Sequence, residues 1–146
     1  KGSPQMHEWI KIGVEYGILG FLGFLSFATV AIGIERWLSY KDTNVEKFSN
    51  KYDLEVHLTK NLTLLSTIAS NAVYIGLLGT VLGIMITFYN MGLGAAADPK
   101  SLMQNLSFTL LATAAGLVVA IPATVIYNFC VRKAETLANK WESIVK

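Results

Sequence analysis

The sequence predicts an all-α integral membrane protein with three transmembrane helices. Of its 146 residues, 53% are hydrophobic and only 15% are charged, and the mean hydropathy is +0.47. This composition is too apolar for an ordinary soluble domain of this size. The apolar residues also lie in long blocks, and about 20 apolar residues of helix are enough to cross a hydrocarbon core. The predicted membrane helices are 12–38, 62–91 and 104–131, within a single domain of residues 1–146.

The first predicted helix, 12–38, has no charged residue in the stretch 16–34. Glu15 precedes this stretch, and Glu35 follows it beside Arg36. Acids at the ends of a membrane helix are more often anchors or ion-pair partners than proton carriers, and we interpret both glutamates in this way. Four glycines in the first half of this helix carry no side chain, which suits close contact with a neighbouring helix: Gly13, Gly17, Gly20 and Gly23.

A mixed-charge connection, 39–61, follows and is expected to be partly helical. The second predicted helix, 62–91, carries no charge. Small and hydroxyl-bearing residues recur along it at helical spacing, so that they share one face: Ser66, Ala69, Gly76, Thr80, Gly83 and Thr87.

The third predicted helix, 104–131, is approached through Asp98-Pro99, a plausible helix start. Pro122 removes one backbone hydrogen bond and is expected to bend this helix. The tail, 132–146, has mixed charge and is expected to continue the helix out of the bilayer. One face again carries small and polar residues: Thr109, Thr113, Gly116, Ala120, Thr124 and Asn128.

The distribution of basic residues predicts the orientation of the chain. Arg36 and the connection 39–61 together carry five Lys and Arg residues, and the tail carries four. The N-terminus carries two, and the link before the third helix carries one. The positive-inside rule therefore places the N-terminus outside and both the connection and the tail in the cytoplasm.

The small-residue faces have two interpretations. Small residues let membrane helices pack closely, and threonines often bond back to their own helix, so the faces can be packing surfaces alone. Alternatively, the hydroxyls of the second and third helices line a hydrated path. The periodicity does not separate these interpretations.

Several functional classes find no support in the sequence. There is no phosphate-binding loop and no nucleophile with a base beside it, so an enzyme is not expected. The histidines and the single cysteine, Cys130, have no metal-ligand spacing, so neither a metal nor a cofactor is expected. The net charge of +2, without a basic cluster interleaved with aromatic residues, does not predict nucleic-acid binding.

Two stretches of the second and third predicted helices form distinctive motifs. The first reads GLLGTVLGIM over residues 76–85. The second reads LATAAGLVVAIPA over residues 111–123 and is followed by Ile126-Tyr-Asn128. The two motifs together are specific, and they resemble the MotA/TolQ/ExbB proton-channel family, most closely its ExbB members. The predicted three-helix, N-out plan agrees with this family.

The resemblance implies a motor subunit in the bacterial inner membrane. Proteins of this family assemble as a homo-oligomeric, typically pentameric, ring in the lipid, and their second and third helices line a pore. A single-span partner of the ExbD type lies in the pore and brings a membrane aspartate. The complex uses the proton-motive force to energise a TonB-like protein, which drives outer-membrane import of iron–siderophore complexes or cobalamin.

The resemblance also assigns residues. Thr80 and Thr113 match the pore threonines of the family, and we add the other threonines of the same faces to the proton path: Thr87, Thr109 and Thr124. Residues expected to pack the helices are Gly76, Gly83, Gly116 and Ala120.

One departure from the family matters. Many ExbB members carry a glutamate at the position of Phe108. Without it, the central part of neither pore helix has an ionisable group, and a threonine hydroxyl does not titrate near neutral pH. The prediction is that the partner supplies the proton carrier alone.

Three alternatives remain beside this interpretation. A TolQ-like subunit that powers outer-membrane maintenance differs little in sequence. A flagellar stator subunit usually has four spans and a large cytoplasmic domain. A passive membrane scaffold would use the small-residue faces only for packing.

Overall fold

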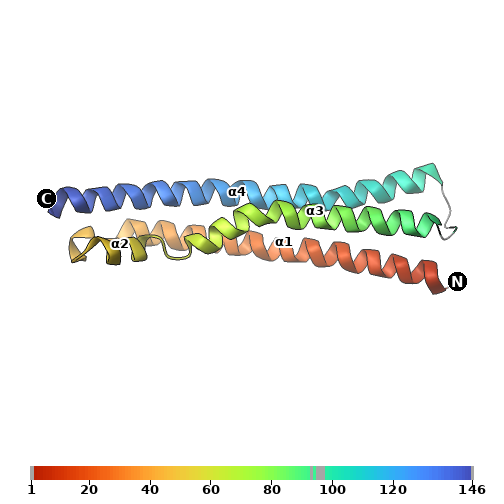
Figure 1. Ribbon diagram of the computed structural model, residues 1–146, viewed down its shortest axis with the longest axis horizontal. Coiled ribbons are helices and arrows are strands. Elements are labelled where there is room, and N and C mark those ends of the chain that lie inside the picture. Colours follow the sequence, from red (N-terminus) through yellow and green to blue (C-terminus); the bar gives the residue numbers. More distant parts are fainter. Residues whose placement is uncertain (1, 93, 95–97, 146) are drawn as a thin grey trace.

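Three long helices run side by side along the molecule. The computed structural model describes residues 2–92, 94 and 98–145, and their side chains from Trp9 onward. Each long helix is long and apolar enough to cross a membrane, which confirms the predicted all-α class with three candidate spans. The N- and C-termini lie at opposite ends of the bundle, and the short helix lies at the C-terminal end (Figure 1). The elements are α1 (Gly2–Asp42), the 3₁₀ helix η1 (Val45–Lys47), α2 (Lys51–Leu58), α3 (Leu62–Gly92) and α4 (Pro99–Val145).

The helices extend beyond the apolar blocks from which they are predicted. α4 begins at Pro99, where the fixed φ of proline suits the first helical position. The Asp98 carbonyl accepts the amide of Leu102 at 2.9 Å, and the Asp98 carboxylate accepts the Ser101 hydroxyl at 3.2 Å. At its other end α4 reaches Val145, so the tail continues the helix as predicted. Hydropathy predicts only the membrane portion of a helix, because charged side chains outside the bilayer do not end it.

α3 and α4 form the most extensive contact in the bundle, and glycines lie where they cross. A Cβ atom added to Gly76 would lie 2.5 Å from the carbonyl oxygen of Ala112. One added to Gly116 would lie 2.6 Å from the carbonyl oxygen of Ala72. The two backbones can approach this closely only because neither glycine has a side chain.

The glycines of α1 behave differently. A Cβ atom added to Gly13, Gly17, Gly20 or Gly23 would meet nothing within 4 Å. The close helix contact that this part of the sequence suggests is therefore not made within a single copy of the chain.

α2 is held between the end of α1 and the C-terminal half of α4. Leu54 and Leu58 are fully buried. The indole nitrogen of Trp141 donates to the Phe48 carbonyl at 2.9 Å. Lys51 forms an ion pair with Glu142, and this contact raises the pKa of Lys51. The connection therefore docks on the bundle instead of extending from it.

Arg36 joins α1 to the C-terminal end of α2. It is 1% exposed, and its guanidinium donates to the carbonyls of His57 at 2.9 Å and Leu58 at 3.2 Å. The Tyr40 hydroxyl donates to the Leu58 carbonyl at 2.5 Å. Carbonyls at a helix C-terminus lack partners within the helix, so a cation there satisfies both hydrogen bonding and the helix dipole. The predicted ion pair of Glu35 with Arg36 is confirmed, at 2.6 Å.

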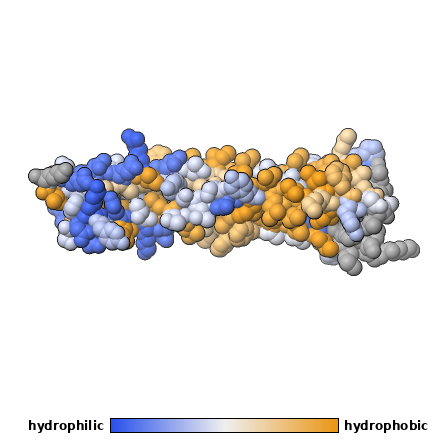
Figure 2. All heavy atoms as spheres, viewed as in Figure 1, coloured by the Kyte–Doolittle hydropathy of each residue, from blue (hydrophilic) through white to orange (hydrophobic). Residues whose placement is uncertain are grey.

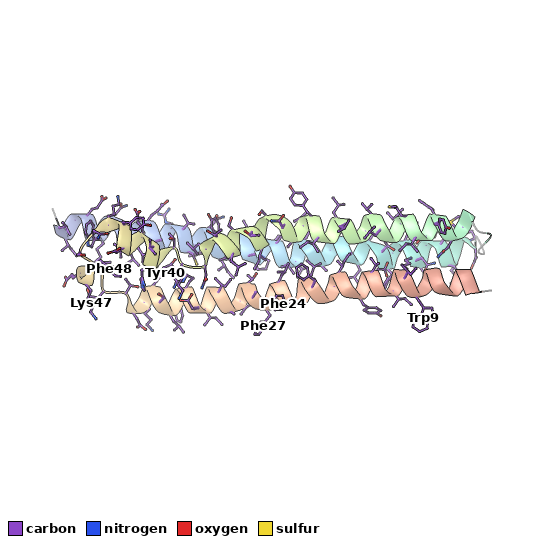
Figure 3. All side chains as sticks on the ribbon, turned by 60° about the horizontal axis from the view of Figure 1, so that its bottom comes forward. Trp9, Phe24, Phe27, Tyr40, Lys47 and Phe48 are labelled. Atoms are coloured by element: carbon purple, nitrogen blue, oxygen red, sulfur yellow. The ribbon has the colours of Figure 1, made fainter. Side chains whose placement is uncertain are left out.

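The outer surface is divided along the long axis. Hydrophilic residues gather at the end that holds α2 and the end of α4, and hydrophobic residues form a broad band between the middle of the molecule and the opposite end (Figure 2). Trp9, Phe24 and Phe27 point away from α3 and α4, and they are 75%, 63% and 72% exposed (Figure 3). Apolar surface of this extent is far larger than a soluble monomer exposes, and it suits lipid or neighbouring protein in a membrane.

Candidate functional site

Two threonines from different helices meet one turn from the crossing of Gly76 and Gly116, at the interface of α3 and α4. The hydroxyls of Thr80 on α3 and Thr113 on α4 are in direct hydrogen-bond contact. The Thr80 hydroxyl also donates to the carbonyl of Thr109 at 3.3 Å. Since Thr80 has a single hydroxyl proton, Thr113 donates when Thr80 bonds to the carbonyl. Thr80 is buried, whereas Thr113 is half-buried. The pair predicted from the family motifs is thus brought together, and its Thr113 side reaches the surface of the subunit.

Thr109 lies deeper and meets a carboxylate from α1. Its side chain is fully buried, and its hydroxyl lies 3.0 Å from Oε1 of Glu15 and 2.9 Å from the carbonyl of Asn105. Its one proton is therefore shared between a charged acceptor and the usual acceptor of its own helix. Glu15 itself is only 2% exposed.

Thr87 belongs to a second contact with α1. The ammonium of Lys11 donates to the Thr87 hydroxyl at 2.8 Å, and this hydroxyl donates to the Gly83 carbonyl at 2.9 Å. Lys11 is 9% exposed. Lys11 and Glu15, which lie one turn apart on α1, therefore both point into the bundle.

Thr80, Thr109, Thr113 and Glu15 form a polar cluster, and a glycine of α3 leaves space for it. A Cβ atom added to Gly83 would lie 2.5 Å from Cγ2 of Thr109 and 3.1 Å from Oε1 of Glu15. Any side chain at this position would collide with Thr109 and crowd the carboxylate. Gly83 is thus packed against the cluster itself, whereas Gly76 and Gly116 lie at the backbone crossing.

The remaining predicted residues lie apart from the cluster. Thr124 is exposed and donates to the carbonyl of Ala120 in its own helix at 2.8 Å. Ala120 is buried in the core. Pro122 is exposed, and α4 is helical on both sides of it. The predicted bend at Pro122 stays a prediction.

Lys11 and Glu15 are the site residues that the sequence interpretation missed. Glu15 was expected to act as an anchor at the membrane interface, but it lies inside the bundle. A signal was present, because the two residues are four apart and share a helix face with Ile18 and Leu22. Ile18 is partly buried and Leu22 almost fully buried, so the charged pair continues an inward face.

The cluster combines hydroxyls that orient hydrogen bonds with one group that can bind a proton. α3 carries no charged residue, and α4 carries none between Lys100 and Arg132. Phe108 packs edge-on against Tyr16, with ring centroids 6.2 Å apart, so it lies at the level of Glu15. The ionisable groups at this level therefore come from α1.

Comparison with known proteins identifies close relatives. Residues 30–143 match the model of the MotA/TolQ/ExbB proton channel family. The chain is 52% identical over 139 residues to the biopolymer transport protein ExbB of Aquifex aeolicus, which covers 95% of this chain and 94% of that protein. It is 53% identical over 129 residues to the putative biopolymer transport protein ExbB-like 2 of Helicobacter pylori, covering 88% of this chain and 86% of that protein. The Tol-Pal system protein TolQ of Pseudomonas aeruginosa is 36% identical over 87 residues, or 60% of this chain and 38% of TolQ.

Proposed function

The chain belongs to the MotA/TolQ/ExbB proton channel family. We propose that it is the proton-channel subunit of an inner-membrane motor of the ExbB–ExbD–TonB type. It is an ExbB-type multi-pass membrane protein. In the proposed complex, several copies form a ring, pentameric by the family resemblance. A single-span ExbD-like partner lies in the pore, and the proton-motive force energises a TonB-like protein for outer-membrane import of iron–siderophore complexes or cobalamin.

The hydroxyl pair of Thr80 and Thr113 is the observation that carries this proposal. It lies one turn from the close crossing of Gly76 and Gly116, between two helices that hold no charge across the membrane. The half-buried Thr113 leaves one side of the pair within reach of a neighbouring segment. In the proposed pore, these hydroxyls orient water and the partner's carboxylic acid, so that a proton passes between them.

The outer surface supports assembly in lipid. The exposed aromatic residues of α1 and the broad apolar band are left uncovered by a single bundle. Lipid and neighbouring copies of the chain would together cover it.

The arrangement of the ends supports the N-out, C-in orientation. α2 and the end of α4 lie together at one end of the bundle, and the N-terminus lies at the other (Figure 1). The basic residues of both cytoplasmic segments would then face the same side, as the positive-inside rule requires. One charge that crosses 100 mV releases about 2.3 kcal/mol, so a few protons supply enough free energy for a mechanical step.

The relatives favour the ExbB role over the TolQ role. The ExbB of Aquifex aeolicus and the ExbB-like protein of Helicobacter pylori match most of the chain at more than half identity, whereas the TolQ of Pseudomonas aeruginosa matches 60% of it at 36% identity.

The proposed function is tested with Thr113→Val, which keeps the shape of the side chain and removes the hydroxyl. In cells that depend on this chain for iron–siderophore uptake, we expect the variant to assemble normally and to lose uptake-dependent growth. The matched control is Thr67→Val on α3, because Thr67 is exposed and donates only to its own helix, to Thr63 at 2.8 Å. Normal uptake by Thr113→Val at normal membrane levels would favour a packing role, as in a passive scaffold.

A further inference from the structure

A carboxylate and an ammonium lie buried inside the bundle on α1, one helical turn apart. Glu15 and Lys11 are almost inaccessible, although they begin a membrane-spanning helix. Burial of charged groups costs free energy, and ionisable side chains inside a membrane bundle usually serve ion or proton movement. The proton path derived from α3 and α4 uses neither group.

The surroundings of Glu15 come from all three long helices. From α4, the Thr109 hydroxyl donates to its carboxylate at 3.0 Å. From α3, Gly83 leaves space beside Oε1. On α1, Lys11 interacts electrostatically with Glu15 while it donates to Thr87. Lys11 is thus a charged side chain that acts on Glu15 within the bundle.

We propose that Glu15 is a proton-binding group that this chain itself contributes to the path. The inference rests on the proposed function and names the residue that receives the proton. Water on the outer side transfers a proton to the Glu15 carboxylate, which becomes a neutral carboxylic acid. The carboxyl O–H then releases that proton, which reaches a carboxylate of the membrane-embedded partner through intervening water, because Glu15 is only 2% exposed and does not meet the partner directly. One proton enters and one leaves, and Lys11 keeps its proton throughout.

The geometry suits both protonation states. When Glu15 is ionised, the Thr109 hydroxyl donates to it and the nearby ammonium offsets its charge. When Glu15 is neutral, Thr109 turns its proton to the Asn105 carbonyl, which is already 2.9 Å away. The hydroxyl can thus follow the proton without a change in the backbone. Glu15 also lies at the start of the uncharged stretch 16–34, which is the outer side in the proposed orientation.

A purely structural tether is the competing explanation. In that role Glu15 only accepts hydrogen bonds that fix α1 against α4. The amide of glutamine accepts the same bond from Thr109 but cannot take up a proton. Glu15→Gln therefore separates the two explanations.

The test uses cells whose iron–siderophore uptake depends on the full complex. In these cells Glu15→Gln is compared with a matched control, Asp98→Asn. Asp98 is an exposed acid near the same membrane face, and asparagine serves as well as aspartate before a helix. We expect Glu15→Gln to assemble and to lose uptake-dependent growth, and Asp98→Asn to retain it. Adding Phe108→Glu to Glu15→Gln should restore growth in part, because it returns a carboxylate to the same level. Normal growth of Glu15→Gln would overturn the proposal.

An infrared measurement keeps the proposal testable if Glu15→Gln does not assemble. Glutamate carboxyl groups are labelled with ¹³C in the intact complex, and spectra are compared between low and high pH. A protonated glutamate in the membrane gives a carboxylic acid band that Glu15→Asp must remove, since aspartate is unlabelled but keeps the charge. Absence of such a band in the unsubstituted complex, or its persistence in Glu15→Asp, would overturn the proposal. This signal does not depend on TonB-linked uptake. Failure of the unsubstituted chain to support uptake would instead count against the proposed function.

Discussion

At the scale of single residues, Arg36 shows how a charged side chain holds two segments together. It is buried, yet its guanidinium is satisfied by two carbonyls at the end of α2 and by the carboxylate of Glu35. A buried donor of this kind is favourable only while every partner is present. Arg36 therefore fixes where the connection between α1 and α3 returns to the bundle.

Arg36→Leu should loosen α2 and lower the free energy of unfolding by about 1–3 kcal/mol, because it removes the guanidinium donor from the His57 carbonyl and leaves the Leu58 carbonyl with the Tyr40 hydroxyl. Hydrogen exchange of the amides in residues 51–58, measured on the purified protein in detergent, should become faster.

Glu35→Gln is the control for this change. The Glu35 side chain is 44% exposed, so its ion pair with Arg36 is partly screened by solvent. We expect a loss below about 1 kcal/mol. An equal loss in both variants would mean that the ion pair, and not the carbonyl contacts, holds α2 in place.

At the scale of helices, the crossing of α3 and α4 depends on the absence of side chains at two positions. Gly76 and Gly116 lie opposite each other, with their Cα atoms close to the site of any added Cβ atom. The threonine pair lies one turn further along the same interface. A change in helix separation would therefore also alter the hydroxyl contact between Thr80 and Thr113.

Gly116→Ala should force α3 and α4 apart, because its new methyl group would lie 2.6 Å from the carbonyl oxygen of Ala72. We expect a loss of about 1–3 kcal/mol in the free energy of unfolding, as for overpacked cores, measured by denaturant titration in detergent.

Gly20→Ala is the matched control, since nothing lies within 4 Å of the added atom. Alanine favours helix over glycine by up to about 1 kcal/mol, so this variant should be unchanged or slightly more stable. Equal stability of the two variants would contradict the close crossing.

At the scale of the whole molecule, the odd number of long helices places the two termini at opposite ends of the bundle. The polar end, with α2 and the end of α4, is distinct from the apolar band (Figure 2). In the proposed orientation, the polar end faces the cytoplasm and the start of α1 faces outward. The position of Glu15 near the outer side depends on this orientation.

The orientation is tested with two single cysteines in a Cys130→Ala background, Ser101→Cys and Ser143→Cys. Both serines are exposed, and they lie near opposite ends of α4. A membrane-impermeant maleimide added to intact spheroplasts should label position 101, and it should label position 143 only after the membrane is opened. The reverse pattern would overturn the proposed orientation. Labelling of both positions from outside would contradict a span between them.

The sequence by itself determined the class of the molecule. Uncharged blocks longer than a bilayer predict three spans, because unpaired charge is costly in hydrocarbon, and helical periodicity predicts which faces are small and polar. Span length and helical periodicity each describe a single helix and contain no information about its neighbours. They therefore identified the threonines and the glycines of α3 and α4, but they left the relation between helices open.

Only the tertiary structure decided which of these residues meet. Thr80, Thr109 and Thr113 come together, whereas Thr124 bonds within its own helix. Glu15 and Lys11 sit at the end of an apolar block, where a charge is equally compatible with an interfacial anchor and with an inward group. The rotation of α1 about its axis separates these cases, because it turns the face of Ile18 and Leu22, and with it both charges, toward α3 and α4. That rotation results from packing against two other helices, and no pattern within α1 contains it.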